Sequence, residues 1–84
     1  MWEVIDKLPR REQEIIFELL ERDNEPVPVM FGVAFSQYIK DWFYRDKVYG
    51  SINDAVYLKE DEYRLLKFSM NRHKKKYNFF NNAN

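Results

Sequence analysis

Two prolines separated by a single residue, Pro26 and Pro28, set the strongest limit on how this chain can fold. The residue before a proline is pushed out of the helical region, so the chain must run extended around them. Before this break, the segment Leu8–Arg22 has apolar residues at helical spacing with charged residues between them, which predicts an amphipathic helix. Pro9 suits the first turn of that helix, and residues 23–26 end it.

The apolar segment Val29–Phe35, directly after the break, has two interpretations. By composition it could be a short buried strand. No second strand is evident in the sequence, however, and a lone strand has nothing to pair with. We therefore expect a helix that begins at Pro28 and runs to about Lys47, with one broad apolar face formed by Phe31, Phe35, Tyr38, Ile39, Trp42 and Phe43.

Gly50 interrupts the helical pattern a second time and can take the left-handed backbone conformation that ends a helix. Ser51, with Asp54 three residues later, resembles a capping box and predicts a short helix over Ile52–Leu58. A longer helix is expected from about Lys59 to Tyr77, because acids fill its first turn and bases its last, as the helix dipole favours. A polar tail follows from about residue 78, and we expect it to fray.

These elements predict an all-α fold: a small bundle of three main helices plus one short helix, in a single domain spanning residues 1–84. A chain of 84 residues makes one domain at most, and its stability is expected to be modest. The residues expected to be buried together are Ile16, Leu19, Phe35, Ile39, Trp42 and Leu66.

The charge pattern gives the first candidate site. The net charge is zero, but residues 1–25 carry eight acids and four bases, whereas residues 59–84 carry seven bases and three acids. From Arg64 to Lys76 there are six bases and no acid, which is typical either of a solvated helix end or of a surface for phosphates or an acidic partner. The candidate contact residues are Arg64, Lys67, Arg72, Lys74, Lys75 and Lys76.

Aromatic residues give the second candidate site. The seven Phe, six Tyr and two Trp are more rings than a core of this size can hold, so some should remain exposed. Tyrosine joins an apolar ring to a polar tip and is enriched in protein interfaces. We take Tyr44, Tyr49 and Tyr57 as the candidate protein interface, with ordinary surface tyrosines as the alternative.

No catalytic, cofactor or metal site is expected. The chain has no cysteine, which excludes disulfides and thiolate chemistry. Its one histidine, His73, stands among cations without the carboxylate partner that acid–base catalysis needs. No segment is apolar and long enough to cross a membrane, and no signal peptide is recognisable, so we expect a cytoplasmic protein. The composition suits a small bacterial or phage reading frame.

The segment Leu8–Ile16, with the sequence LPRREQEII, resembles the opening helix of the DNA-reading domain of bacterial sigma factors and of similar response-regulator modules. In those domains a short turn and a recognition helix follow. Here Pro26 and Pro28 and an aromatic segment follow instead, so the resemblance ends after one helix and assigns no functional residue.

The expected function is that of a non-catalytic binding or regulatory module that acts through protein–protein contacts, with another protein or with a second copy of itself. The acidic first helix and the basic last helix could meet head to tail between two copies. The alternative is nucleic-acid binding through the basic segment Arg64–Lys76.

Overall fold

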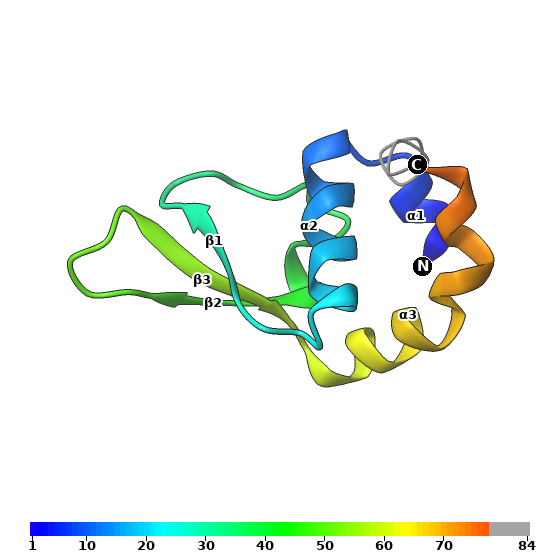
Figure 1. Ribbon diagram of the computed structural model, residues 1–84. Coiled ribbons are helices and arrows are strands. Elements are labelled where there is room, and N and C mark those ends of the chain that lie inside the picture. Colours follow the sequence, from blue (N-terminus) through cyan, green and yellow to red (C-terminus); the bar gives the residue numbers. More distant parts are fainter. Residues whose placement is uncertain (78–84) are drawn as a thin grey trace.

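The computed structural model describes residues 1–77, and they form a mixed α/β fold (Figure 1). The elements in chain order are helix α1 (Trp2–Asp6), helix α2 (Arg10–Glu21), strand β1 (Val27–Met30), the 3-10 turn η1 (Lys40–Trp42), strand β2 (Phe43–Lys47), strand β3 (Asn53–Leu58), helix α3 (Glu60–His73) and the 3-10 turn η2 (Lys74–Lys76). The expectation of an all-α bundle is wrong. The two amphipathic helices predicted before the prolines and after Lys59 are confirmed as α2 and α3. The predicted polar tail lies outside the described residues.

The three strands form one antiparallel sheet in the order β1-β3-β2. The helix expected from Pro28 to Lys47 is replaced by β1, a loop, η1 and β2, and the short helix expected over Ile52–Leu58 is strand β3. The two errors have one physical cause. A strand over residues 27–30 is plausible only with a partner, and its partner is the segment expected to form the short helix, with Val27 opposite Val56 in the register.

The sheet has a covered face and an open face. Side chains alternate along β3, so that Asp54, Val56 and Leu58 are buried while the residues between them are half-buried. Helix α2 contacts both β1 and β3, and it covers the inner face. The outer face therefore carries the alternate residues, among them Tyr44 and Tyr57, which lie directly opposite each other on β2 and β3.

Asn24 joins the end of α2 to the end of the sheet. It adopts a left-handed backbone conformation with φ of 63°, which asparagine tolerates better than most residues. Its side-chain amide donates to the Leu58 carbonyl and its side-chain oxygen accepts from the Leu58 amide, both at 2.9 Å. The predicted end of the helix over Leu8–Arg22, at residues 23–26, is thus confirmed, and Asn24 also fixes where β3 stops.

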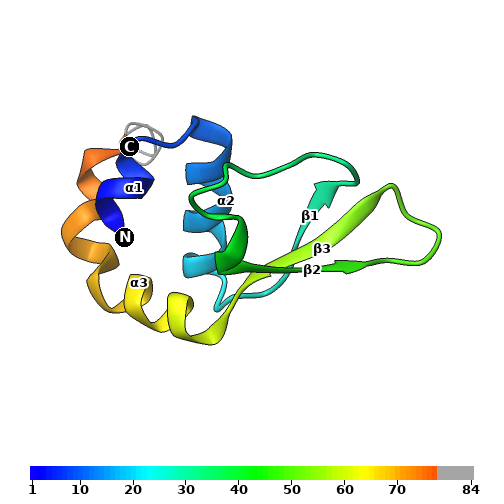
Figure 2. The same ribbon diagram turned by 180° about the vertical axis from the view of Figure 1, so that it is seen from behind.

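Helix α2 stands between the sheet and the pair formed by α1 and α3, while the β2–β3 hairpin projects from the other end of the molecule (Figures 1 and 2). Of the six residues expected in the core, Ile16, Leu19, Ile39 and Leu66 are buried; Phe35 and Trp42 are half-buried and pack against the core. Phe31 and Tyr38, assigned to an apolar helix face, are exposed because no helix forms there. The buried apolar residues are Trp2, Ile5, Leu8, Ile15, Ile16, Phe17, Leu19, Leu20, Val27, Val29, Ile39, Phe43, Val56, Leu58, Leu66, Met70 and Tyr77.

The first helix docks on the last through Trp2. The indole ring of Trp2 stacks on the imidazole of His73 with centroids 4.5 Å apart and 10° between the planes. Its Nε1 donates to Ser69 Oγ at 2.6 Å. His73 is therefore a packing residue, and its buried Nδ1 has no hydrogen-bond partner within residues 1–77.

Tyr77 closes the same end of the core and should make stability depend on alkaline pH. Burial, and then the hydrogen bond that its hydroxyl donates to Asp6 Oδ1 at 2.5 Å, raise the pKa of Tyr77 above its ordinary value. The folded protein thus holds this proton more tightly than the unfolded chain. The contribution to stability is complete below about pH 10, the ordinary tyrosine pKa, and declines above it.

We expect the urea midpoint of the wild-type protein to fall as the pH rises through this range, and Tyr77→Phe to show a smaller fall because phenylalanine cannot ionise. Burial also raises the pKa of Tyr57 and of Tyr63, so the variant should retain part of the decline. At neutral pH the variant should be less stable by about 1 kcal/mol, because the hydrogen bond is missing. Parallel curves for the two proteins above pH 10 would contradict this role.

Candidate interaction surfaces

Part of the predicted basic surface is not free to bind a partner, because two of its lysines contact α2. Lys74 Nζ lies 2.9 Å from Glu21 Oε1, and Lys67 Nζ donates to the Leu20 carbonyl at 2.6 Å. Leu20 is in the last turn of α2, where backbone carbonyls lack helical partners and attract cations. These two lysines therefore hold α3 and η2 against α2.

Two further cations of the predicted set also have acidic neighbours. Lys76 Nζ lies 3.8 Å from Asp6 Oδ2, and Arg64 Nε lies 2.9 Å from Glu60 Oε1 one turn earlier in α3. The acidic and basic ends of the sequence thus meet within one chain. The six candidate residues do not form one continuous face clear of carboxylates, which is the arrangement that nucleic-acid binding by the whole set would need.

The remaining two cations, Arg72 and Lys75, are exposed and form no ion pair within residues 1–77. They follow an unusual pair of apolar residues on the outer side of α3: Phe68 is 87% exposed and Leu65 is 63% exposed. Sequence reasoning missed Phe68 because it judged the basic segment by charge alone. The i, i+4 spacing of Phe68 and Arg72 could have indicated that they share one helix face.

The three candidate interface tyrosines all lie in the β2–β3 hairpin. Tyr44 and Tyr57 pair on the open sheet face with ring centroids 5.4 Å apart, and Tyr49, in the turn, is fully exposed. The Tyr57 hydroxyl donates to Asp46 Oδ2 at 3.2 Å. Burial, and then this hydrogen bond, raise the pKa of Tyr57 above its ordinary value. Tyr44 in turn has the Lys59 ammonium 5.6 Å above its ring.

Exposed apolar side chains gather at the projecting end of the sheet. The Phe31 amide donates to the Ile52 carbonyl at 2.8 Å, which places these two residues side by side, and Lys47 Nζ lies 5.3 Å from the centre of the Phe31 ring. We call this set the hairpin surface; it consists of Met30, Phe31, Val33, Val48, Tyr49 and Ile52. Of these, the sequence indicated only Tyr49. Met30, Phe31 and Val33 fell in the helix expected up to Lys47, and Ile52 fell in the short helix expected over Ile52–Leu58.

Backbone turns at two glycines shape this end. Gly32 and Gly50 have φ of +88° and +77°, in the left-handed region that side chains rarely adopt. The break predicted at Gly50 is confirmed, but it closes a hairpin and does not end a helix. The capping box predicted at Ser51 is absent; Ser51 Oγ instead accepts a hydrogen bond from the Asn53 amide at 3.0 Å.

Arg45 fixes the loop that carries part of the hairpin surface. From β2 its guanidinium reaches Asp54 Oδ2 on β3, with Nη2 at 3.1 Å, and it also donates to the carbonyls of Met30 and Val33. Its Cζ lies 5.3 Å from the centre of the Phe35 ring. One side chain therefore joins β2 and β3 to the end of β1 and the loop after it. These contacts hold the backbone of the exposed residues Met30 and Val33 in place.

The two edges of the sheet are poorly suited to pairing with another strand. Edge strand β1 contains Pro28, which has no N–H to donate, and it follows Pro26. Edge strand β2 contains three consecutive charged residues, 45–47, which protect an edge from unwanted pairing. The open face and the tip of the hairpin, rather than the strand edges, are thus available for contacts.

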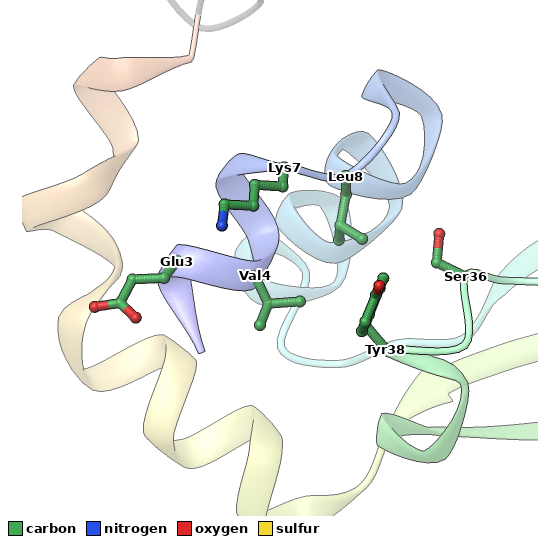
Figure 3. Close-up of a pocket in the computed structure, with 6 residues that line it drawn as sticks. All are labelled: Glu3, Val4, Lys7, Leu8, Ser36 and Tyr38. Atoms are coloured by element: carbon green, nitrogen blue, oxygen red, sulfur yellow. The ribbon is translucent and has the colours of Figure 1, made fainter.

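A groove of about 370 Å³ lies between α1 and the segment before η1 (Figure 3). Val4 and Leu8 point toward the Tyr38 ring across it, and the Glu3 carboxylate points away from Tyr38 (Figure 3). Ser36, on its wall, already binds Glu12 through both its amide (2.7 Å) and its hydroxyl (3.1 Å). The groove is therefore an apolar slot without converging polar groups, and its chemistry does not define a ligand.

Within residues 1–77, no cluster of three or more histidine or acidic side chains is arranged to bind a metal ion. None of the helices in this part of the chain combines the length and the hydrophobicity needed to cross a lipid bilayer. Compared with known protein families, with curated proteins and with solved structures, the chain finds no match.

Proposed function

We propose that this protein is a non-catalytic binding module that recognises another protein through the hairpin surface. The observation that carries the proposal is the gathering of six exposed, large apolar side chains at the projecting end of the sheet. Single exposed apolar residues are normal on soluble proteins, but several large ones gathered at one end of a molecule mark a site where a partner binds. Absence of cysteine fits a reducing, cytoplasmic location for this activity.

The residue types and their surroundings support the same proposal. Phenylalanine, tyrosine and methionine are enriched in protein interfaces, and all three occur in the hairpin surface. A hollow of about 280 Å³ beside it, lined by residues such as Pro28, Val48 and Ala55, could receive a partner's side chain. Tyr44 and Tyr57, with ring centroids 5.4 Å apart on the outer face of the same hairpin, add further aromatic area.

Association through this surface should depend little on salt. The acidic and basic ends of the chain pair internally, as Lys74 with Glu21 and Lys76 with Asp6. These two pairs weaken the head-to-tail attraction between two copies that the sequence led us to expect. Contacts made by Phe31, Tyr49 and Ile52 would be apolar instead, and screening acts on charges rather than on apolar contacts.

Photo-crosslinking tests the proposal. A benzophenone amino acid in place of Tyr49, in cells of the encoding organism, should give a discrete crosslinked product, whereas the same group at exposed Arg11 on α2 should not. The mass of the product distinguishes a second copy from another protein. Adding Phe31→Ser should remove the product without changing the melting temperature, because exposed substitutions usually alter stability by less than about 0.5 kcal/mol.

Failure of position 49 to yield any product, or equal products from positions 49 and 11, would overturn the proposal. Persistence of the product in the Phe31→Ser protein would show that the exposed apolar side chains are not what the partner recognises. Repeating the experiment with purified protein at low and moderate salt separates self-association from binding of another protein.

A further inference from the structure

The outer side of α3 carries a second surface that the hairpin does not use. Phe68 stands at its centre, and residues three to four positions away fall on the same side of a helix. Lys75, in η2, continues the row one turn after Arg72. We call this set the α3 stripe; it consists of Arg64, Leu65, Phe68, Arg72 and Lys75.

The α3 stripe is positively charged and contains no carboxylate. No acid occurs between Tyr63 and Tyr77, and Arg72 and Lys75 have no ion pair within residues 1–77. Arg64 forms an ion pair with Glu60, with its Nε 2.9 Å from Glu60 Oε1. By contrast, Lys67 and Lys74 are turned toward α2 and are held there. The stripe thus retains the free positive charge of the basic segment around one exposed ring.

We infer that the α3 stripe binds single-stranded nucleic acid, with a base stacked on the Phe68 ring and neighbouring phosphates beside Arg72 and Lys75. An aromatic ring with cations next to it is the combination that single-strand-binding proteins use, because every base has a face to stack and every linkage a phosphate. Arg72 lies one helical turn from Phe68, so both can reach the same few nucleotides.

A single strand suits this surface better than a duplex does. The base faces of a duplex are covered by stacking, so Phe68 would find no partner there. A long rigid duplex along α3 would also bring phosphates to the acidic first turn of the helix, at Glu60 to Glu62. An acidic peptide could meet the cations as well, but it offers no planar face to the ring.

This inference stands apart from the proposed function. The α3 stripe and the hairpin surface share no residue, and they lie at opposite ends of the molecule (Figures 1 and 2). A protein with both surfaces could hold a single strand at one end and a protein at the other.

Fluorescence anisotropy with labelled oligothymidylate and oligouridylate at low salt tests the inference. Phe68→Ala should weaken binding about tenfold or more, because base–ring stacking accounts for that much affinity in single-strand-binding proteins. The double variant Arg72→Gln with Lys75→Gln should weaken binding and lower the log–log salt slope by about 0.7 for each phosphate that is no longer neutralised. The matched control is Lys74→Gln, which removes a cation held by Glu21 and should weaken binding much less.

Each variant of the stripe should keep the wild-type melting temperature, since Phe68, Arg72 and Lys75 are exposed. The inference is overturned if the wild-type protein shows no binding at tens of micromolar, or if Phe68→Ala binds as tightly as the wild type. Preference for duplex DNA, or displacement of the oligonucleotide by an equal charge of polyglutamate, would overturn it too. The last result would assign the stripe to an acidic protein instead.

Discussion

Replacing Phe17 with alanine is expected to leave the protein largely unfolded. Phe17 is 1% exposed, and its ring contacts those of Trp2 and Tyr77 with centroids 5.5 and 4.7 Å away. It therefore joins α2 to α1, and to Tyr77 directly after η2. Truncating a buried phenylalanine costs about 3–5 kcal/mol, and small domains have little more stability than that in total.

Urea denaturation followed by circular dichroism measures the effect. The Phe17→Ala protein should have a far lower midpoint than the wild type, or no folded baseline at all. Phe68→Ala is the matched control, because it removes the same ring from an exposed position on α3 and should move the midpoint little. Equal midpoints for the two variants would mean that Phe17 is not a core residue.

Helices α2 and α3 could be predicted because their signals are local, whereas the short helix α1 (Trp2–Asp6) was not predicted. In α2, Ile15, Ile16 and Leu19 recur at helical spacing and are all buried. In α3, acids in the first turn and bases in the last match the helix dipole. Each of these signals depends on residues within one or two turns, so no knowledge of distant partners was needed.

The sheet escaped prediction because its signals are distant or disguised. Strand β3 alternates buried and half-buried residues, but one of the buried positions is Asp54. A charged residue at an inward position breaks the apolar alternation that marks a strand. Its burial is compensated by Arg45 on the neighbouring strand. Likewise, Asn24 pairs with the backbone of Leu58, 34 residues away, and nothing near either residue indicates it.

The candidate sites illustrate the same limit. Residue type alone points to Tyr44, Tyr49 and Tyr57, and the hairpin brings them to one projecting element, while their role in binding stays a prediction. Charge along the sequence indicates a single basic face, yet Lys67 and Lys74 turn toward α2 while Arg72 is exposed. Which cation pairs with which acid depends on how the helices pack. Counting charges along the sequence gives no information about that packing.

Replacing Arg45 with glutamine should destabilise the protein by about 3 kcal/mol, because it removes one partner of a largely buried ion pair. The Asp54 side chain is only 12% exposed, and without Arg45 its carboxylate would be buried with no compensating charge. The double variant Arg45→Leu with Asp54→Leu should recover most of the stability, since apolar side chains of similar size can replace a buried pair at little cost.

The double variant also separates stability from the order of the hairpin surface. Arg45 donates to the carbonyls of Met30 and Val33, and leucine cannot make those hydrogen bonds. Hydrogen exchange of residues 31–35 should therefore quicken in the double variant even where its urea midpoint is restored, and crosslinking through position 49 should weaken. Unchanged exchange in these residues would mean that packing of Phe35 on Phe43, with ring centroids 4.7 Å apart, holds the loop without Arg45. A binding surface has lower affinity when its residues must be ordered on association. If Arg45 does not order the loop, its only role is therefore to neutralise Asp54.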